Sequence, residues 1–194
     1  MQKDSILNII LVGVGLCIVC GAVISTVAVS LRDQQEQNVI FDQQSKIIDA
    51  ARLLEVYPSS QEALASIEEV VVNLNDGQPS GIPPQQYDLD SILRDPSQHT
   101  VLNGSEDIAM ISVRENLSKV YIEYRNNELK TLILPVRGYG LWGTLYGYLA
   151  LDSDLNTIVG LEFYKHKETP GLGAEVDNPN WKKLWNGKKV FDEN

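Results

Sequence analysis

Cysteine and histidine are scarce in this chain. Its two cysteines, Cys17 and Cys20, both lie inside a long apolar run near the N-terminus. The rest of the chain therefore has no thiol that could form a disulfide, act as a nucleophile or hold a metal cluster. The two histidines, His99 and His166, have no companions at metal-ligand spacing, so we expect no metal site. The role of the two cysteines stays open.

Basic runs are missing as well. The chain has 16 lysines and arginines against 26 acidic residues, which gives a formal net charge of −10. Nucleic acids and anionic lipid head groups attract clustered positive charge. We therefore expect no nucleic-acid partner. The sequence also lacks a P-loop, a nucleophile elbow and a paired Cys and His, so we expect no catalytic residues of a hydrolase or kinase.

Charge of either sign is absent between Ile6 and Leu31, a run of 26 residues. As a helix this run would be about 39 Å long, which exceeds the roughly 30 Å of a bilayer's hydrocarbon core. A cleaved signal peptide has a shorter apolar segment, and a lipoprotein signal at Cys20 would need a small residue where Val19 stands. We predict a single uncleaved span in contact with membrane lipid, and the flanking Lys3 and Arg32 do not decide its orientation.

A helical stalk is expected to follow the span. Ile40, Ile47 and Leu54 recur every seven residues, which is typical of a helix with one apolar stripe. We expect this helix to stop near Tyr57 and Pro58, because proline disfavours helix at the residue before it. The predicted division is an anchor at 1–33, a stalk at 34–58 and a soluble domain at 59–194.

The first part of the soluble domain combines a short helix, a strand and a loop. Ser59 followed by Glu62 forms a capping-box pattern, which predicts a helix that continues to about Glu68. The β-branched residues of 70–74 predict a strand. Residues 76–105 are rich in proline and polar residues, so we expect a long loop there, either disordered or used for binding.

Five strand-like segments follow, joined by connections that are too short to contain crossover helices. The pairing should therefore be antiparallel, in an α+β arrangement with helices on one face of the sheet. Asp177 or Asn178 can cap a last helix that has Pro179 at its first position and ends at Gly187. The expected strands are 108–114, 119–125, 130–136, 144–152 and 157–164.

Residues Gly138 to Gly143 fit the pattern G-x-G-x-x-G, which occurs in dinucleotide-binding folds. In those folds a helix follows the glycines and holds the pyrophosphate at its N-terminus. Here the next residues alternate like a strand, so we reject that interpretation. We expect instead a turn in which the backbone closely approaches a flat group, with Leu141 and Trp142 exposed at its edge.

A second tight segment is Glu168-Thr169-Pro170-Gly171-Leu172-Gly173. Pro170 restricts one backbone dihedral, and the two glycines allow close packing or a left-handed conformation. Taken alone, the segment is better explained as an ordinary surface turn after a strand, because glycine and proline occur in most loops.

Together, these motifs resemble the NqrC subunit of the bacterial sodium-translocating NADH:quinone reductase. The resemblance covers the anchor, the stalk and the β region, and it is weakest between Asp76 and Ser105. Its most specific segments are Ser30 to Gln35, Leu134 to Trp142, Glu168 to Gly173 and Asn178 to Trp181.

The resemblance implies a flavoprotein of the bacterial inner membrane, with its soluble domain on the periplasmic side. Proteins of this family carry FMN and relay electrons from NADH towards ubiquinone, coupled to sodium export, together with the other subunits of the complex. No complete active site is expected in this chain alone. By resemblance, the non-covalent surroundings of the FMN are Leu141, Trp142, Glu168, Thr169, Gly171, Leu172 and Gly173.

One family feature is missing. In the family a flavin transferase joins the FMN phosphate to a threonine in a Ser-Gly-Ala-Thr motif, which lies after the tryptophan helix. The nearest similar segment here, Ser80 to Pro83, lacks the threonine and lies elsewhere. We expect the covalent threonine beyond Asn194, in a longer chain. The alternative is a protein that cannot hold FMN covalently.

Two other functions stay open. The homologous flavin subunit of the ion-translocating ferredoxin:NAD oxidoreductase shares the anchor and the flavin domain. A membrane-anchored assembly or binding module without redox chemistry would use the same glycine turns as purely structural features.

Overall fold

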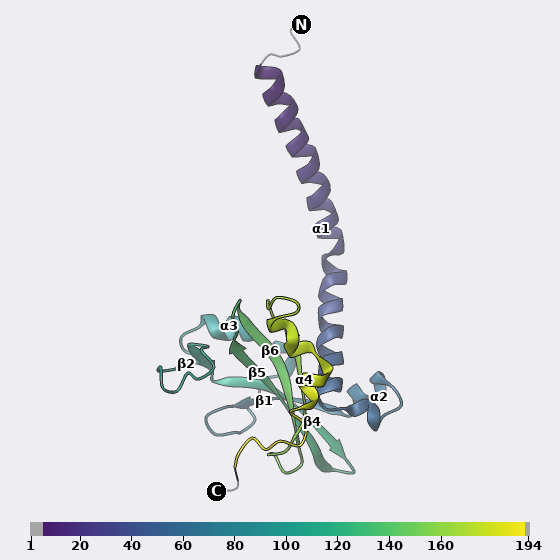
Figure 1. Ribbon diagram of the computed structural model, residues 1–194, viewed down its shortest axis with the longest axis vertical. Helices are drawn as coiled ribbons and strands as arrows, with labels where there is room; N and C mark the ends of the chain where they lie inside the picture. The colour runs from purple at the N-terminus through teal and green to yellow at the C-terminus, as the bar shows by residue number, and fades with distance from the viewer. Residues whose placement is uncertain (1–5, 193–194) are drawn as a thin grey trace. The chain divides into compact units, whose positions relative to one another are not determined.

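The computed structural model describes residues 6–192, which form seven strands, four α-helices and three short 3₁₀ helices (Figure 1). The chain forms two compact units, 1–42 and 43–194. The helices are α1 Ile6–Ala50, α2 Ser60–Ala65, α3 Leu89–Arg94 and α4 Pro179–Lys183, with 3₁₀ turns at Leu53–Glu55, Pro84–Gln86 and Gly173–Asp177. The strands are β1 Ile67–Asn73, β2 His99–Val101, β3 Val113–Glu115, β4 Leu117–Arg125, β5 Glu128–Tyr139, β6 Thr144–Asp152 and β7 Ile158–Lys165.

The segment predicted to span a membrane is helical throughout. Helix α1 contains the whole uncharged run, and within residues 6–192 it is the one helix that is long and apolar enough to cross a membrane. Its apolar side chains are exposed, for example Val12 and Val29 at 72% and 75%. Such exposure suits side chains that face lipid, since a helix satisfies its own backbone hydrogen bonds. Helix α1 therefore fits a single-pass membrane anchor.

The end of α1 differs from the expectation. The helix stops at Ala50 rather than near Pro58, and Arg52 adopts a left-handed conformation with φ of 54°. The reversal lets Leu53 turn back into the core, where it is 1% exposed. The predicted heptad stripe is wrong for two of its three positions, because Ile47 is buried while Ile40 and Leu54 are more than half exposed.

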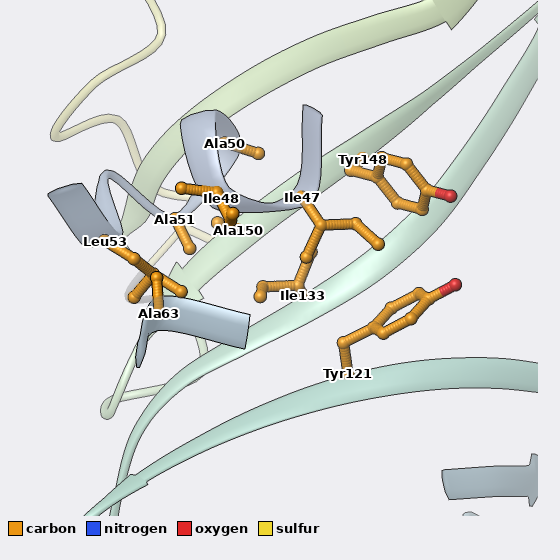
Figure 2. Packing of buried hydrophobic residues seen from close by; sticks show 10 residues of the cluster. All are labelled: Ile47, Ile48, Ala50, Ala51, Leu53, Ala63, Tyr121, Ile133, Tyr148 and Ala150. Carbon is orange, nitrogen blue, oxygen red and sulfur yellow. The ribbon is translucent and has the colours of Figure 1, made fainter. Parts of the chain in front are cut away.

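The sheet confirms the predicted antiparallel α+β fold. Its strand order is β1-β4-β5-β6-β7, and every neighbouring pair is antiparallel. Tyr121, Ile133, Ala150 and Gly160 are cross-strand neighbours in one row. The last turns of α1 pack against this row (Figure 2). The core therefore depends on small residues where the helix meets the sheet.

Gly160 is the tightest point of this contact. A Cβ at this position would clash with the carbonyl oxygen of Ala50, which is backbone and cannot rotate away. We expect Gly160→Ala to lower the free energy of unfolding by about 1–3 kcal/mol, the usual range for overpacking. Urea denaturation measures the change. The control is Gly138→Ala, also in a strand, where the nearest atom to an added Cβ is 3.7 Å away; equal losses in both variants would contradict the prediction.

Helix α4 contacts side chains on both sides of strand β7, so it covers the edge of the sheet rather than a single face. Trp181 lies 6.5 Å from Phe163 between ring centroids, on one side of β7. The adjacent Lys182 bonds to Glu162 on the other side of the strand, at 2.6 Å. The expectation that the helices cover a single face is therefore wrong for α4. Because β7 is an edge strand, α4 also shields part of it from pairing with another chain.

Among the other local expectations, the two helix caps are confirmed, two element boundaries are shifted, and the long loop is wrong. Ser59 caps α2 by accepting the Glu62 N–H at 3.3 Å, and the Asn178 side chain caps α4 at 2.9 Å. Helix α2 ends at Ala65, earlier than predicted, and strand β1 begins before residue 70. The long loop expected at 76–105 contains α3, β2 and a 3₁₀ turn instead.

The β6–β7 turn is linked to the C-terminal segment by Asp154. Its carboxylate accepts hydrogen bonds from Lys189 at 2.8 Å and from Thr157. Lys189 and then Thr157 hold the pKa of Asp154 below its ordinary value of 3.8. Since the pKa is lowered in the folded state, this link is fully present above the ordinary value and is lost only as the pH falls through the lowered pKa.

We therefore expect this turn to keep its hydrogen bonds at pH values well below the ordinary pKa of aspartate. The chemical shifts of the Thr157 and Asn156 amides, whose N–H groups donate to Asp154, should titrate well below the ordinary aspartate pKa. In Asp154→Asn that titration should vanish. A midpoint at the ordinary value in the unmodified protein would contradict the lowered pKa.

Candidate functional site

The glycine turn joins β5 to β6. Tyr139 and Thr144 form the last cross-strand pair, and the Gly140 N–H donates to the Gly143 carbonyl at 2.8 Å. Leu141 and Trp142 are exposed at 77% and 62%, as predicted. Because a strand follows the glycines, no helix N-terminus is available to bind a pyrophosphate. The geometry agrees with the rejection of a dinucleotide fold.

Glu168 connects this turn to the second glycine segment. Its Oε1 accepts the backbone N–H of Trp142 at 3.1 Å. A Cβ on Gly140 would clash with Oε1, and a Cβ on Gly173 would clash with Oε2. The carboxylate therefore occupies a space that exists only because both positions are glycine. We call this contact the Glu168 brace.

The residues after Glu168 form a compact turn. The carbonyl of Thr169 accepts the N–H groups of Leu172 at 3.1 Å and Ala174 at 3.2 Å. Gly171 has φ of 74°, a left-handed conformation that other residues rarely adopt. The turn exposes Leu172 at 72%. The structure thus brings the two predicted segments together, and an exposed apolar side chain lies on either side of the Glu168 brace.

His166 positions the brace, a role that the sequence did not reveal. Its Nδ1 accepts the N–H of Glu168 at 3.2 Å, so its Nε2 carries the proton and donates to Asp177 at 2.7 Å. The stem of Lys167 lies along Gly143, with Cδ 3.4 Å from where a Cβ would be. The bond to Glu168 is local, but the contacts of His166 with Asp177 and of Lys167 with Gly143 join separate segments, and no local pattern predicts them.

A loop at residues 107–112 lies beside the turn, where a strand from residue 108 was expected. The carboxylate of Asp107 accepts the N–H groups of Ile111 and Ser112, both at 2.7 Å. These bonds satisfy the backbone locally, so β3 begins only at Val113. The Ala109 carbonyl accepts the Tyr139 N–H at 2.8 Å. The loop is therefore attached to the end of β5.

An open apolar groove of about 350 Å³ begins at the end of β5 and runs under α4. Aliphatic and aromatic side chains dominate its walls, which is typical of sites for flat organic ligands. The exposed apolar side chains at the Glu168 brace and the close backbone approach at its glycines fit a flat flavin ring with polar edges. The groove is lined by Val136, Arg137, Gly138, Tyr139, Leu145, Leu149, Leu161, Phe163, Trp181 and Trp185.

Comparison with known proteins agrees with this geometry. Residues 140–194 match the family model of the FMN-binding domain. This segment contains the first glycine segment from Gly140 onward, all of the second one, the Glu168 brace and α4. The match therefore falls on the part of the chain that contains the two segments of the candidate site.

Relatives of the whole chain include the NqrC subunit of the Na(+)-translocating NADH-quinone reductase from Pseudomonas aeruginosa. It is 44% identical over 196 residues, which cover 98% of this chain and 75% of the relative. The same subunit from Vibrio vulnificus is 41% identical over 194 residues, covering 100% of this chain and 76% of the relative.

Solved structures of such subunits have the same fold. The crystal structure of Shewanella oneidensis NqrC superimposes with a TM-score of 0.69 at 31% identity, over 77% of this chain and 70% of that one. The equivalent protein from Parabacteroides distasonis gives a TM-score of 0.60 at 30% identity, over 83% and 71%. Sequence and structure together show that this chain belongs to the NqrC family, whose members are subunits of the Na(+)-translocating NADH-quinone reductase.

Proposed function

We propose that the chain is the FMN-carrying electron-transfer subunit of this reductase and relays electrons between partner subunits, from NADH towards ubiquinone, coupled to sodium export. The observation that carries the proposal is the Glu168 brace, which joins the two segments that the resemblance assigns to the flavin. FMN, when bound, supplies the redox chemistry. The protein holds, orients and partly shields it.

Each proposed site residue has a role that its contacts support. Leu141, Trp142 and Leu172 are exposed and would pack against the ring. Glu168 fixes the Trp142 backbone. The other three residues shape the backbone, since Thr169 holds the turn, Gly171 provides its left-handed residue and Gly173 leaves room for Glu168.

The anchor, stalk and domain division is part of the proposal. We place the anchor at 1–33, the stalk at 34–58 and the flavin domain at 59–194, with the domain on the periplasmic side of a bacterial inner membrane. Ile47 and Ile48 are buried against the sheet, which supports a stalk whose end is built into the domain. A tether of this kind keeps a carrier near its partners and raises its effective concentration.

We also propose that the FMN phosphate is esterified to a threonine outside residues 1–194, by a dedicated flavin transferase. The test is the mass of the full-length protein after co-expression with that transferase. We expect one added FMN. An unmodified mass, together with no retained flavin after native purification, would refute the carrier function and favour an assembly module without redox chemistry.

The choice of electron partner is tested separately. The complex that contains this protein should oxidise NADH and reduce a quinone. Reduction of NAD by ferredoxin as the main activity would instead favour the ferredoxin:NAD oxidoreductase. Both reactions are measured on the same purified complex, and the absorbance change of the nicotinamide reports both.

A further inference from the structure

Five of the eight tyrosines of the chain gather around one cavity. The cavity has a volume of about 250 Å³ and lies on the face of the sheet that the end of α1 covers. Tyrosine suits places where one end of the side chain is packed and the other meets polar groups. We call this space the tyrosine cavity, and its tyrosines are Tyr87, Tyr121, Tyr146, Tyr148 and Tyr164.

Aromatic faces form most of its wall. The rings of Tyr148 and Tyr164 stack with centroids 4.9 Å apart, and Tyr121 meets Tyr148 edge-on at 5.6 Å. Tyr146 lies 6.2 Å from Tyr164. Mutual ring contacts of this kind hold the side chains in place without a ligand. The wall is therefore preorganised.

Two of the five tyrosine hydroxyls, those of Tyr146 and Tyr164, are available as hydrogen-bond donors, whereas Tyr121 and Tyr148 bond to each other and Tyr87 bonds to Ser118. The hydroxyls of Tyr121 and Tyr148 point to the same side, away from the alanines under α1 (Figure 2). In the part of the chain that the structure describes, Tyr146 and Tyr164 make ring contacts but no hydrogen bond to the protein. Burial raises the pKa of Tyr87 to about 12 and also raises the pKa of Tyr121, Tyr148 and Tyr164. These hydroxyls stay protonated at neutral pH.

The charges around the cavity cancel. Arg137 donates to Glu115 at 2.6 Å and to the Val113 carbonyl at 2.7 Å. The side chains of this ion pair are only about 10% exposed, and the buried Nε of Arg137 has no hydrogen-bond partner among residues 6–192. Lys119 and Asp88 are the other two charged residues of the lining. Two positive and two negative groups do not favour an ion over a neutral molecule.

We propose that the tyrosine cavity is a binding site for a small neutral planar ring that carries oxygen acceptors on its rim. The aromatic wall stacks on the ring, and the hydroxyls of Tyr146 and Tyr164 donate to its oxygens. A cavity of this size admits one ring system, since sites for drug-sized ligands usually occupy about 300–1,000 Å³.

This site is separate from the proposed FMN site. Strands β5 and β6 contribute to both, but successive side chains of a strand point to opposite faces. Tyr146 and Tyr148 line the tyrosine cavity, whereas Leu145 and Leu149 line the apolar groove; Val136 and Arg137 belong to both linings. None of the seven residues proposed to surround the FMN lines the tyrosine cavity, so the proposal does not depend on flavin binding.

Tyrosine-selective NMR of the full chain in detergent, with labelled ring carbons, tests the proposal. The probe is 4-hydroxybenzamide, which is neutral and planar. We expect saturable shifts for the cavity tyrosines at probe concentrations up to about 1 mM, the usual range of a small fragment. Tyr124, an exposed residue outside the cavity, should not shift. No saturation, or equal shifts at every tyrosine, would overturn the proposal.

Two matched probes and two variants test the chemistry. The anion 4-hydroxybenzoate and the non-planar myo-inositol should each bind at least tenfold more weakly than 4-hydroxybenzamide. If either binds as tightly as 4-hydroxybenzamide or more tightly, the site does not select neutral planar rings and the proposal is refuted. Tyr164→Phe removes a hydroxyl that bonds no protein group among residues 6–192, so the fold should persist while the Kd for 4-hydroxybenzamide rises about tenfold. Tyr124→Phe should leave that Kd unchanged. An unchanged Kd in Tyr164→Phe would show that the hydroxyls do not donate to the ligand and would overturn that part of the proposal.

Discussion

Replacing Glu123 with alanine is expected to lower the free energy of unfolding by about 2–4 kcal/mol, through the loss of a buried side chain and of the hydrogen bonds that it accepts. Glu123 has no exposed surface, although it carries a carboxylate. Its Oε1 accepts hydrogen bonds from Tyr57 at 2.9 Å and from Arg125 at 2.8 Å, and its Oε2 accepts one from Thr131 at 3.2 Å. The variant leaves these donors without their acceptor and opens a space in the core.

Tyr57 explains why this carboxylate affects more than one strand. It follows the reversal at the end of α1 and bonds to β4, so Glu123 attaches the connection after the helix to the sheet. A loss of this size corresponds to a fall in Tm of roughly 10 °C for a domain of this length. Calorimetry of the full chain in detergent measures it directly.

The control is Glu128→Ala, which also removes a glutamate in an ion pair. Glu128 bonds to Lys130 at 2.7 Å, but its side chain is 71% exposed. Exposed pairs contribute at most about 1 kcal/mol. A large effect of Glu128→Ala, or a small effect of Glu123→Ala, would show that burial does not decide the strength of these contacts.

The second large effect is expected for Gly173→Ala, which tests the proposed FMN site. The added Cβ would clash with Glu168 Oε2 and lie 3.0 Å from the Glu168 Cβ, so the clash is not limited to the flexible end of the side chain. The carboxylate must move, and the Trp142 N–H loses its acceptor. We expect FMN affinity to fall at least tenfold, which equals about 1.4 kcal/mol. The protein tested is residues 1–194 loaded with free FMN, where binding is non-covalent, and flavin absorbance per protein after dialysis measures the retained cofactor.

Gly104→Ala provides the matched control. An added Cβ at Gly104 meets nothing within 4 Å, so flavin content should not change. The Tm of both variants shows whether the fold is intact. Normal flavin retention in a folded Gly173→Ala protein would contradict the role of the Glu168 brace, while leaving FMN binding elsewhere in the domain unaffected.

Features that depend on neighbouring residues were predictable from the sequence. The uncharged run specified a helix because only a helix satisfies its backbone within lipid. Alternation predicted β6 at Thr144–Asp152, the same bounds that the structure has. Ser59 and Asn178 marked helix starts because their side chains bond backbone groups two or three residues away. The motifs also indicated the family, which the relatives confirmed.

Features that depend on distant residues were not predictable. Periodicity continued α1 towards Pro58, but the burial of Leu53 ended the helix at Ala50, because the hydrophobic gain of returning to the sheet exceeds the small preference for one more helical turn. The strand expected from residue 108 gave way to a loop held by Asp107.

The features of the candidate site likewise divide into those that the sequence predicted and those that it did not. The sequence alone identified the glycine segments and their exposed Leu141 and Trp142, since glycine and proline restrict the backbone locally. Only the tertiary structure decided that Glu168 joins the two segments and that five tyrosines surround one cavity. These contacts arise when the antiparallel register aligns residues from separate strands, and no local pattern contains that register.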